Sequence, residues 1–460
     1  MITYHPASFR DPDARVLDSS RDRILRVLTE EADRIDEQVR CTGLMDSLIS
    51  EGVMIENWKT TETSFPKGWV SVIESKLLPF VNYPYEWSFS MLKDASILTL
   101  DLTERALENG FVVKDASAFN ILFEGTCPRF IDITSFNDYR DGDPWIAYGQ
   151  FCDHFLAPLM LEAYKGIPFQ SFLRGNLDGI SISNQLAHIL GFSCISKPGV
   201  LKHIILRALV EKYSRDLDTQ KRKKVRQIKI PKRSILKNIR NQKELISKLN
   251  SRYKSQWSDY EDRSSYSPDM LEEKKVFLNS AMERISKVSL ALDFGANIGR
   301  YTQILAKNFD YVVGLDYDPG VIDRLYLSIK GGPLESKILP LVIDIMNPSP
   351  SQGWRGRERR SFLSRARADF SLYFAFIHHI CLGHGVPLQG FIDLIFDLAE
   401  HSVIEFVSLD DPMSEKILAT KRIKHTDYNL INFRDIISRK GNIVEEKSLS
   451  KTRTIFLVSK

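Results

Sequence analysis

Acids and glycines stand at spacings that suit a nucleoside-binding turn. Asp293, Gly295, Asn297 and Gly299 alternate with other residues in the run Leu-Ala-Leu-Asp-Phe-Gly-Ala-Asn-Ile-Gly-Arg-Tyr. The glycines let the backbone turn sharply and approach a ligand, and the N–H groups that begin the next helix point at it. Asp316 lies 21 positions after Gly295, the offset at which a second strand brings a carboxylate to ribose hydroxyls. The sequence therefore predicts a crevice that binds a nucleoside.

The number of glycines separates two classes of nucleoside ligand. A dinucleotide-binding turn has a third glycine three residues after the second, which the run Asp-x-Gly-x-Asn-x-Gly lacks. This run resembles motif I of class I S-adenosylmethionine-dependent methyltransferases. The resemblance implies that S-adenosyl-L-methionine is the cofactor, with Asp293, Gly295, Asn297 and Gly299 around its methionine part and ribose, and Asp316 on the ribose hydroxyls. The alternative is an ordinary strand-to-helix turn that binds no ligand.

The resemblance implies roles for three more side chains. Asp344 ends a third apolar run and would accept a hydrogen bond from the adenine amino group, unless it only caps a helix. His378 and His379 stand in the loop that faces the methyl group in this fold. A neutral imidazole there could take a proton from a hydroxyl or amine acceptor, so both are the catalytic candidates. Alternatively, one histidine caps the next helix and the other packs.

More acids follow the fifth apolar run, in Glu-Phe-Val-Ser-Leu-Asp-Asp-Pro-Met. We expect Asp410 or Asp411 to cap the next helix, because Asp is a favoured N-cap residue and Pro suits the first helical position. For Glu405, both orienting an acceptor and capping stay open.

Helices and strands that could position these residues alternate through the last part of the chain. Ser267 and Pro268 mark the start of a helix that runs to about residue 286. Apolar runs predict strands at 288–294, 311–316, 338–345, 370–377 and 403–408. The runs 442–448 and 453–459 are too close for a crossover helix and predict an antiparallel hairpin. The expected fold class is α/β: a Rossmann-like class I methyltransferase sheet with an antiparallel last strand, preceded by an α+β N-terminal domain.

The first half of the chain carries a second, weaker pattern. Asp115 and Asn120 are five residues apart, and Asp132 follows in an apolar run. They resemble the catalytic loop and the metal-binding Asp of protein kinases and small-molecule phosphotransferases. A Gly-rich loop, a Lys in a Val-Ala-Ile-Lys context and the loop His are missing. We therefore expect a kinase-like relic used for packing or substrate binding rather than phosphoryl transfer.

Length and charge suggest how the chain is divided. Its 460 residues predict two or more domains. The net charge of +4 conceals a basic stretch between residues 212 and 254, where sixteen Lys and Arg face three acids. We expect an N-terminal domain at 1–213 that recognises the acceptor, a basic linker at 214–264, and the S-adenosylmethionine domain at 265–460. The basic stretch is expected to be a solvated helix or linker, and the alternative is contact with an anionic partner such as nucleic acid or a membrane surface.

Composition also bears on partners and location. Aromatic residues are sparse in the basic stretch and no Asp/Asn-Pro-Pro-Tyr/Phe run follows the fourth strand, so nucleic acid is not expected as a partner. Five cysteines without a CxxC pair predict neither a disulfide scaffold nor a zinc site, and no metal is expected. The start has no signal-peptide pattern and no apolar run is long enough to span a membrane, so we expect a cytoplasmic protein. The oligomeric state is left open.

Six short runs extend the resemblance to nearly the whole chain outside 215–260. In order they are Phe-Arg-Asp-Pro (9–12), Tyr-Pro-Tyr-Glu-Trp-Ser-Phe (83–89), Lys-Asp-Ala-Ser-Ala-Phe-Asn (114–120), Phe-Ile-Asp-Ile-Thr-Ser-Phe (130–136), Pro-Trp-Ile-Ala-Tyr-Gly-Gln-Phe-Cys (144–152) and Glu-Phe-Val with Asp-Pro-Met (405–413). Together they resemble a group of bacterial two-part methyltransferases that includes the rhizobial host-specific nodulation protein NoeA. The resemblance implies synthesis or modification of a host-recognition (nodulation) signal, with a small-molecule or glycolipid acceptor. A phosphotransferase and a non-catalytic nucleoside-binding scaffold are the alternatives.

Overall fold

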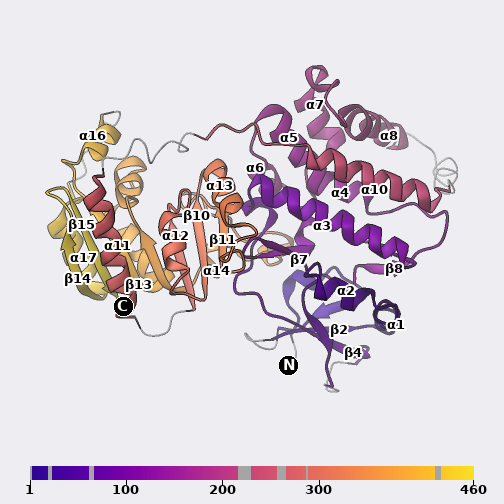
Figure 1. The fold of residues 1–460 in the computed structure, drawn as a ribbon, viewed down its shortest axis with the longest axis horizontal. Coiled ribbons are helices and arrows are strands. Elements are labelled where there is room, and N and C mark those ends of the chain that lie inside the picture. The colour runs from indigo at the N-terminus through magenta and orange to yellow at the C-terminus, as the bar shows by residue number, and fades with distance from the viewer. Residues whose placement is uncertain are drawn as a thin grey trace. The chain divides into compact units, whose positions relative to one another are not determined.

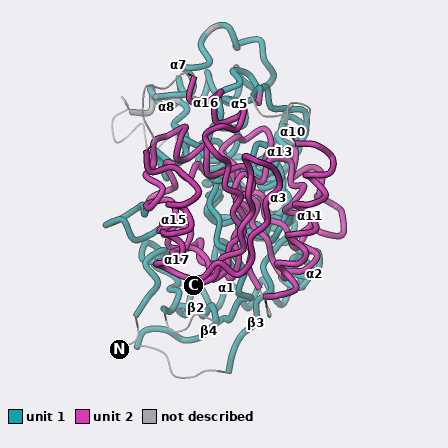
Figure 2. Tube along the Cα trace, turned by 90° about the vertical axis from the view of Figure 1, so that its left-hand side faces the viewer, with its two compact units in different colours: residues 1–254, 351–359 teal, residues 255–350, 360–460 magenta. Residues whose placement is uncertain are grey.

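The computed structural model describes residues 3–18, 23–61, 67–215, 229–255, 266–285, 289–419 and 426–460. The chain forms two compact units, which Figure 2 shows in different colours. Unit 1 comprises residues 1–254 and 351–359, and unit 2 comprises residues 255–350 and 360–460.

Unit 1 begins with a four-stranded antiparallel sheet in the order β1-β2-β4-β3 (Figure 1). Two helices follow β2, and Thr29 caps the first of them by accepting a hydrogen bond from the Ala32 N–H. The bounds are β1 (Ala14–Val16), β2 (Ile24–Leu28), α1 (Glu30–Cys41), α2 (Leu44–Ser50), β3 (Asn57–Lys59) and β4 (Ser71–Ser75).

A long helix and two short antiparallel pairs continue unit 1. Ser88 caps the 20-residue helix α3 (Phe89–Glu108), whose inward positions are filled by small and apolar side chains. Next, β5 (Phe111–Val113) pairs with β8 (Phe136–Asp138), and β6 (Ile121–Glu124) pairs with β7 (Cys127–Phe130). These helices and strands agree with the expected α+β N-terminal domain, and the Asp115–Asn120 loop lies between β5 and β6.

The rest of unit 1 is helical, and its last helix changes the expected domain division. These helices are α4 (Tyr148–Phe151), α5 (Ala157–Lys165), α6 (Gln170–Gly175), α7 (Ala187–Leu190), α8 (Leu206–Arg215) and α10 (Lys232–Ser247). Within the expected basic linker at 214–264, α10 instead packs on α3. Its apolar residues Ile235, Ile239 and Ile246 are buried, and Arg240 pairs with Glu104 at 2.6 Å. Unit 1 therefore extends to residue 254, while residues 216–228 and 256–265 of the expected linker lie outside the described residues.

The stretch 351–359 belongs to unit 1 although the residues on both sides of it belong to unit 2. Glu358 is buried and pairs with Arg10 at 3.0 Å. The guanidinium carbon of Arg359 lies 4.5 Å from the centre of the Phe119 ring, a cation–π contact. An ion pair and a ring contact thus join this stretch to unit 1, an excursion that no sequence pattern predicted.

Unit 2 is built on a seven-stranded sheet in the order β11-β10-β9-β12-β13-β15-β14 (Figure 1). The first five strands in this order are mutually parallel, and β15 pairs antiparallel with both β13 and β14. The expected α/β sheet with an antiparallel tail is confirmed. The bounds are β9 (Leu290–Phe294), β10 (Tyr311–Asp316), β11 (Ile338–Val342), β12 (Ala368–Tyr373), β13 (Ala399–Val407), β14 (Asn442–Ser448) and β15 (Arg453–Ser459).

Helices cover both faces of this sheet. Side chains of a strand alternate between its faces: Phe370 and Leu372 of β12 join one apolar cluster with α11, α12 and α13, whereas Tyr373 contacts Phe391 of α15. The helices of unit 2 are α11 (Pro268–Glu283), α12 (Arg300–Leu305), α13 (Pro319–Ile329), α14 (Phe362–Arg365), α15 (Leu388–Leu398), α16 (Pro412–Leu418) and α17 (Leu430–Lys440). Burial on both sides explains why the central strands read as continuous apolar runs.

Candidate functional site

Unit 2 contains a cavity of about 530 Å³ at the carboxyl ends of its central parallel strands. Ligands bind at this edge in open α/β sheets, and the volume lies within the range of small-molecule sites. Five residues predicted to bind the cofactor line the cavity: Asp293, Gly295, Asn297, Asp316 and Asp344. The structure therefore brings together residues at the carboxyl ends of three strands, β9, β10 and β11.

The turn after β9 adopts a conformation that depends on glycine. Gly295 has φ 76°, and a Cβ at this position would lie 3.0 Å from Phe376 Cδ2. Asn297 also has positive φ, 49°, which is uncommon outside glycine and found mostly for Asn and Asp. The N–H groups of Gly295 and Ala296 donate to the Leu315 carbonyl of β10, at 2.8 and 3.0 Å. These bonds join the turn to the strand that carries Asp316.

Gly299 has a structural role rather than a place on the cavity wall. It is the N-cap of α12 with φ 87°, and it is not among the residues that line the cavity. A Cβ at Gly299 would clash with Leu325, whose Cδ1 would be 2.2 Å away. This glycine allows α12 to pack closely against α13.

Burial makes Asp293 of β9 and Asp316 at the end of β10 hard to ionise. It raises the pKa of Asp316 to about 6, although the N–H groups of Asn297 and Asp318 donate to this carboxylate at 3.1 and 3.0 Å. It raises the pKa of Asp293 to about 7, although Thr302 Oγ1 donates to it at 2.6 Å. Further donors, such as the hydroxyls or the ammonium group of a ligand, would stabilise the ionised forms.

Asp344 is an exposed residue on the cavity wall. Its carboxylate accepts a hydrogen bond from the Met346 N–H at 2.9 Å, and its carbonyl accepts one from the Asn347 N–H at 3.0 Å. The side chain therefore stabilises a turn, and no helix begins there. One carboxylate oxygen of Asp344 has this partner and the other can face a ligand.

The two predicted catalytic histidines lie in different surroundings. His379 lines the cavity, whereas His378 is fully buried and is not part of the cavity wall. Burial lowers the pKa of His379 to about 4, with the nearby His384 and Arg453 adding to the effect, so its imidazole is neutral at neutral pH. Both ring nitrogens of His378 are buried without a hydrogen-bond partner within the described part of the chain. The geometry supports a role at the cavity for His379 and packing for His378.

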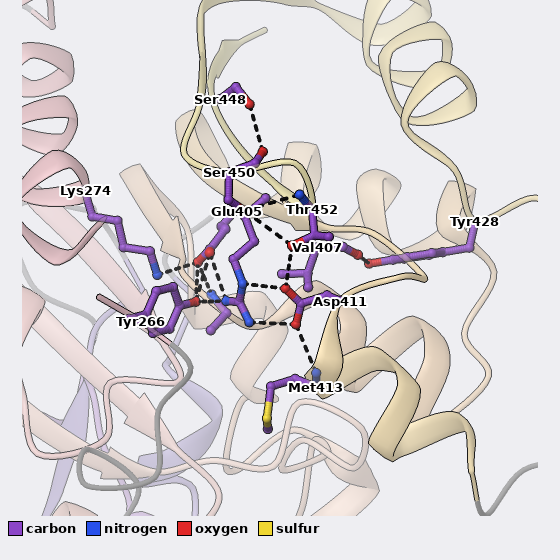
Figure 3. Close-up of polar contacts among 12 residues, drawn as sticks. Tyr266, Lys274, Glu405, Val407, Asp411, Met413, Tyr428, Ser448, Ser450 and Thr452 are labelled. Carbon is purple, nitrogen blue, oxygen red and sulfur yellow. Dashed lines mark hydrogen bonds and ion pairs between the residues drawn. The ribbon is translucent and has the colours of Figure 1, made fainter. Parts of the chain in front are cut away.

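Figure 3 shows a cluster of charged side chains joined by hydrogen bonds and ion pairs. Glu405 is 0% exposed; its carboxylate pairs with Lys274 Nζ at 2.6 Å and Arg453 Nη1 at 3.2 Å, and accepts a hydrogen bond from Tyr266 Oη at 2.8 Å. Arg453 also pairs with Asp411 at 2.8 Å. Tyr266 and Lys274 line the cavity as well, so the cluster connects its wall to the antiparallel strand β15.

The charges of this cluster balance one another. Burial opposes ionisation of Glu405, but Lys274 and Arg453 outweigh it and hold the pKa of Glu405 below its ordinary value. Burial lowers the pKa of Lys274 to about 8 although Glu405 opposes the change. With Asp411 also ionised beside Arg453, two cations face two anions. Buried charges are tolerated only in such paired arrangements.

The acids after β13 have distinct positions. Asp411 is the N-cap of α16 and accepts a hydrogen bond from the Met413 N–H at 3.0 Å, which confirms the capping expectation for the pair Asp410 and Asp411. Glu405 instead accepts a hydrogen bond from the Ala375 N–H at 2.8 Å. Ala375 lines the cavity with φ 50°, a strained value for alanine. Glu405 therefore supports a strained backbone position on the cavity wall.

Sequence reasoning missed the cations of the cluster. Lys274 stands at helical spacing between Leu271 and Leu278 in α11, and a lysine within an apolar stripe is a signal, because lysine is almost never fully buried without a partner. Arg453 interrupts no pattern, since it opens a strand. Tyr266 has no sequence signal beyond its place beside the helix cap.

The kinase-like residues of unit 1 form hydrogen bonds and an ion pair with other groups of the protein. The Asn120 side chain donates to the Asp115 carbonyl at 3.3 Å. Arg26 pairs with one carboxylate oxygen of Asp132, and Ser135 Oγ donates to the other. Burial opposes ionisation of Asp132, but the Arg26 charge and these hydrogen bonds keep its pKa below the ordinary value. The Arg26 guanidinium is paired with the carboxylate that would have to bind the metal ion in a phosphotransferase. The geometry therefore does not favour the phosphotransferase alternative.

Known structures resemble part of the chain. The N-methyltransferase NodS from Bradyrhizobium japonicum WM9 shares 16% identity over 42% of this chain and 97% of its own, with a TM-score of 0.30. The bifunctional kinase-methyltransferase WbdD shares 18% identity over 42% of this chain and 38% of its own, with a TM-score of 0.29. These TM-scores are too low to support a conclusion about activity.

Sequence comparison covers the whole length. No model of a protein family matches the chain. The nodulation protein NoeA of Rhizobium meliloti (strain 1021) is 32% identical over 457 residues, which cover 98% of this chain and 94% of NoeA. Within the described residues, no helix has both the length and the apolar character needed to cross a membrane. The identity and coverage with NoeA show that the chain belongs to the NoeA family of nodulation proteins.

Proposed function

We propose that this protein is an S-adenosyl-L-methionine-dependent methyltransferase whose donor site is the cavity of unit 2. The observation that carries the proposal is that Asp293, Gly295, Asn297 and Asp316 meet on the wall of one cavity. The strand order, with its antiparallel pair at the end, supports it. Membership of the NoeA family supports a role in nodulation.

The residues present fit this cofactor. Gly295 leaves room that a Cβ would fill, so the backbone can approach a ligand closely. Asp316 is a half-buried carboxylate with a raised pKa, which suits the two hydroxyls of a ribose. Asp293 would face the methionine part, and Asp344 the adenine amino group.

The chemistry of the site follows from the cavity wall. When bound, the cofactor supplies an electrophilic methyl group. Phe374 and Phe376 line the cavity and would exclude water from the reaction. His379 is neutral at neutral pH and can accept the proton of the acidic oxonium that a hydroxyl acceptor becomes when it attacks the methyl carbon. Glu405 fixes the position of Ala375 on the same wall.

We further propose that the acceptor is a small molecule or a glycolipid that becomes part of a bacterial host-recognition (nodulation) signal, and that unit 1 recognises it. Mass spectrometry of the secreted signal from strains with and without the gene tests this role. A loss of one methyl group in the mutant is the expected result, and an unchanged signal would reject the role.

Calorimetry with S-adenosyl-L-methionine tests the donor site directly. The wild-type protein should bind it, and Asp316→Asn should bind it more weakly. Absence of binding by the folded wild-type protein would reject the methyltransferase. Binding without any methyl transfer to extracts that contain the signal would favour a non-catalytic scaffold.

A further inference from the structure

Helix α8 exposes its apolar face. Leu206, Leu209, Val210 and Tyr213 stand at the i, i+3, i+4 and i+7 positions of one helix face, and they are 49%, 58%, 63% and 67% exposed. Leu201, in the π-helical turn η7 (Val200–Ile205) before α8, is 51% exposed. Single exposed apolar residues are ordinary, but this is a continuous row.

The charged face of α8 points the opposite way, into unit 1. The Arg207 side chain is only 14% exposed, and it pairs with Asp153 at 3.0 Å and with Glu211 at 2.8 Å. A surface helix normally buries its apolar stripe and exposes its charges. The orientation of α8 is therefore the reverse of the usual one, and such an apolar surface indicates an interaction site.

Four lysines lie on α8, in η7 and near the start of α10. Lys212 is exposed on α8 itself, and Lys202 Nζ donates to Asn238 Oδ1 of α10 at 2.9 Å, which brings α10 beside η7. Lys232 and Lys237 stand on the same part of α10. Within the described ranges, none of these four lysines has an ion pair with a carboxylate. Their charges are therefore available to an anionic partner.

We propose that α8 binds the surface of an anionic phospholipid bilayer, with its apolar row among the acyl chains and its lysines at the lipid phosphates. An amphipathic helix with apolar residues on one side and lysines around them binds membranes in this way. The basic composition of residues 212–254 complements an anionic surface. A second copy of the chain would instead place two sets of lysines against each other, which costs free energy.

Vesicle flotation with the full-length protein tests this inference. The vesicles consist of phosphatidylcholine alone or of phosphatidylcholine mixed with phosphatidylglycerol. The wild-type protein should float with the mixed vesicles, bind pure phosphatidylcholine far less, and be released by added salt, because salt screens the lysine–phosphate attraction. No flotation with the mixed vesicles would overturn the proposal.

Matched variants separate the apolar row from a general change in surface. Leu209→Ser/Val210→Ser should reduce the bound fraction at least tenfold. The control Leu327→Ser/Ile431→Ser, which changes two exposed residues on helices of unit 2, should bind like the wild type. Equal binding by both double variants would overturn the proposal. So would light scattering that shows a wild-type dimer and a monomeric Leu209→Ser/Val210→Ser variant without lipid, because the face would then be a self-interface.

Discussion

Replacing Asp316 by asparagine should weaken donor binding without lowering stability at about pH 8. The carboxylate sits at the end of β10 and accepts two backbone hydrogen bonds, from Asn297 and Asp318. Asparagine has nearly the same shape but no charge, and only its carbonyl oxygen accepts hydrogen bonds. The substitution therefore removes the proposed charge-assisted contacts to the ribose hydroxyls and leaves one of the two backbone N–H groups without its acceptor, while the cavity stays almost unchanged in size.

The loss of affinity can be worked out from these contacts. A hydrogen bond to a charged group contributes about 1.5–3 kcal/mol, and about 1.4 kcal/mol corresponds to a tenfold change in Kd. Asp316→Asn should therefore raise the Kd for S-adenosyl-L-methionine by about tenfold to a hundredfold in calorimetry. Its effect on the ligand-free protein is different, because the ionised Asp316 carries a burial cost. A pKa of about 6 in place of 3.8 corresponds to a cost of about 3 kcal/mol at high pH. The thermal midpoint of the variant at about pH 8 should thus not fall below that of the wild type.

Donor affinity should also depend on pH. Hydroxyls that donate to Asp316 favour its carboxylate, so its pKa in the complex falls below the value of about 6 in the free protein. Below about pH 6, binding must release a proton and affinity should weaken as the pH falls. Asp316→Asn should remove the contribution of Asp316 to this dependence and leave that of Asp293, whose pKa of about 7 in the free protein is lowered by the ligand in the same way.

The control is Asp369→Asn, at the amino end of β12 in the same sheet. Asp369 likewise accepts two backbone hydrogen bonds, from the Ser289 and Leu290 N–H groups at 2.8 and 2.9 Å, but it is not part of the cavity wall. This variant should bind the donor like the wild type. Our reasoning fails if Asp316→Asn keeps full affinity, or if both variants lose affinity equally.

Three further predictions concern buried charges. Asp293→Asn should raise the thermal midpoint more at about pH 8 than at about pH 5, because burial raises the pKa of Asp293 from 3.8 to about 7 and the wild type loses stability as the pH rises between these two values. Equal midpoint changes at both pH values would contradict this. Lys274→Met should lower the free energy of unfolding by about 3 kcal/mol, because the Glu405 charge then lacks one of its partners. In a double-mutant cycle measured by denaturation, adding Glu405→Gln should restore part of the lost free energy. Strictly additive effects of the two substitutions would contradict the pairing. Arg26→Met should destabilise the protein, because the Asp132 carboxylate loses the cation that is paired with it. Calorimetry of the wild-type protein with Mg-ATP should show no binding heat. A measurable heat would restore the phosphotransferase alternative.

The turn and the acid of the proposed donor site could be predicted because their positions are set locally. Gly295 and Asp316 belong to one strand–helix–strand unit, in which the residue offset decides where the acid lies. The antiparallel tail was equally readable from the short gap between β14 and β15. The bounds of these two strands agree with the predicted runs 442–448 and 453–459.

The charge cluster could not be predicted because it depends on the register of distant strands. Arg453 reaches Glu405 only because β15 lies beside β13 with Arg453 opposite Val407. Lys274 comes from α11, ahead of the whole sheet. A sequence pattern shows that Lys274 is unusual in its stripe, but only the assembled sheet shows which carboxylate neutralises it.

The basic stretch shows why charge density alone is a weak guide to structure. The excess of lysine and arginine suggested one solvated linker, yet the helix inside this stretch and the helix that leads into it behave in two ways. Helix α10 buries Ile235, Ile239 and Ile246 and uses Arg240 to pair with Glu104. The preceding helix α8 keeps its apolar row in solvent and turns Arg207 inward, where it pairs with Asp153. The burial of the apolar residues, not the number of cations, distinguishes a helix that completes a core from a helix whose apolar face still needs a partner. The cations then indicate the charge of that partner.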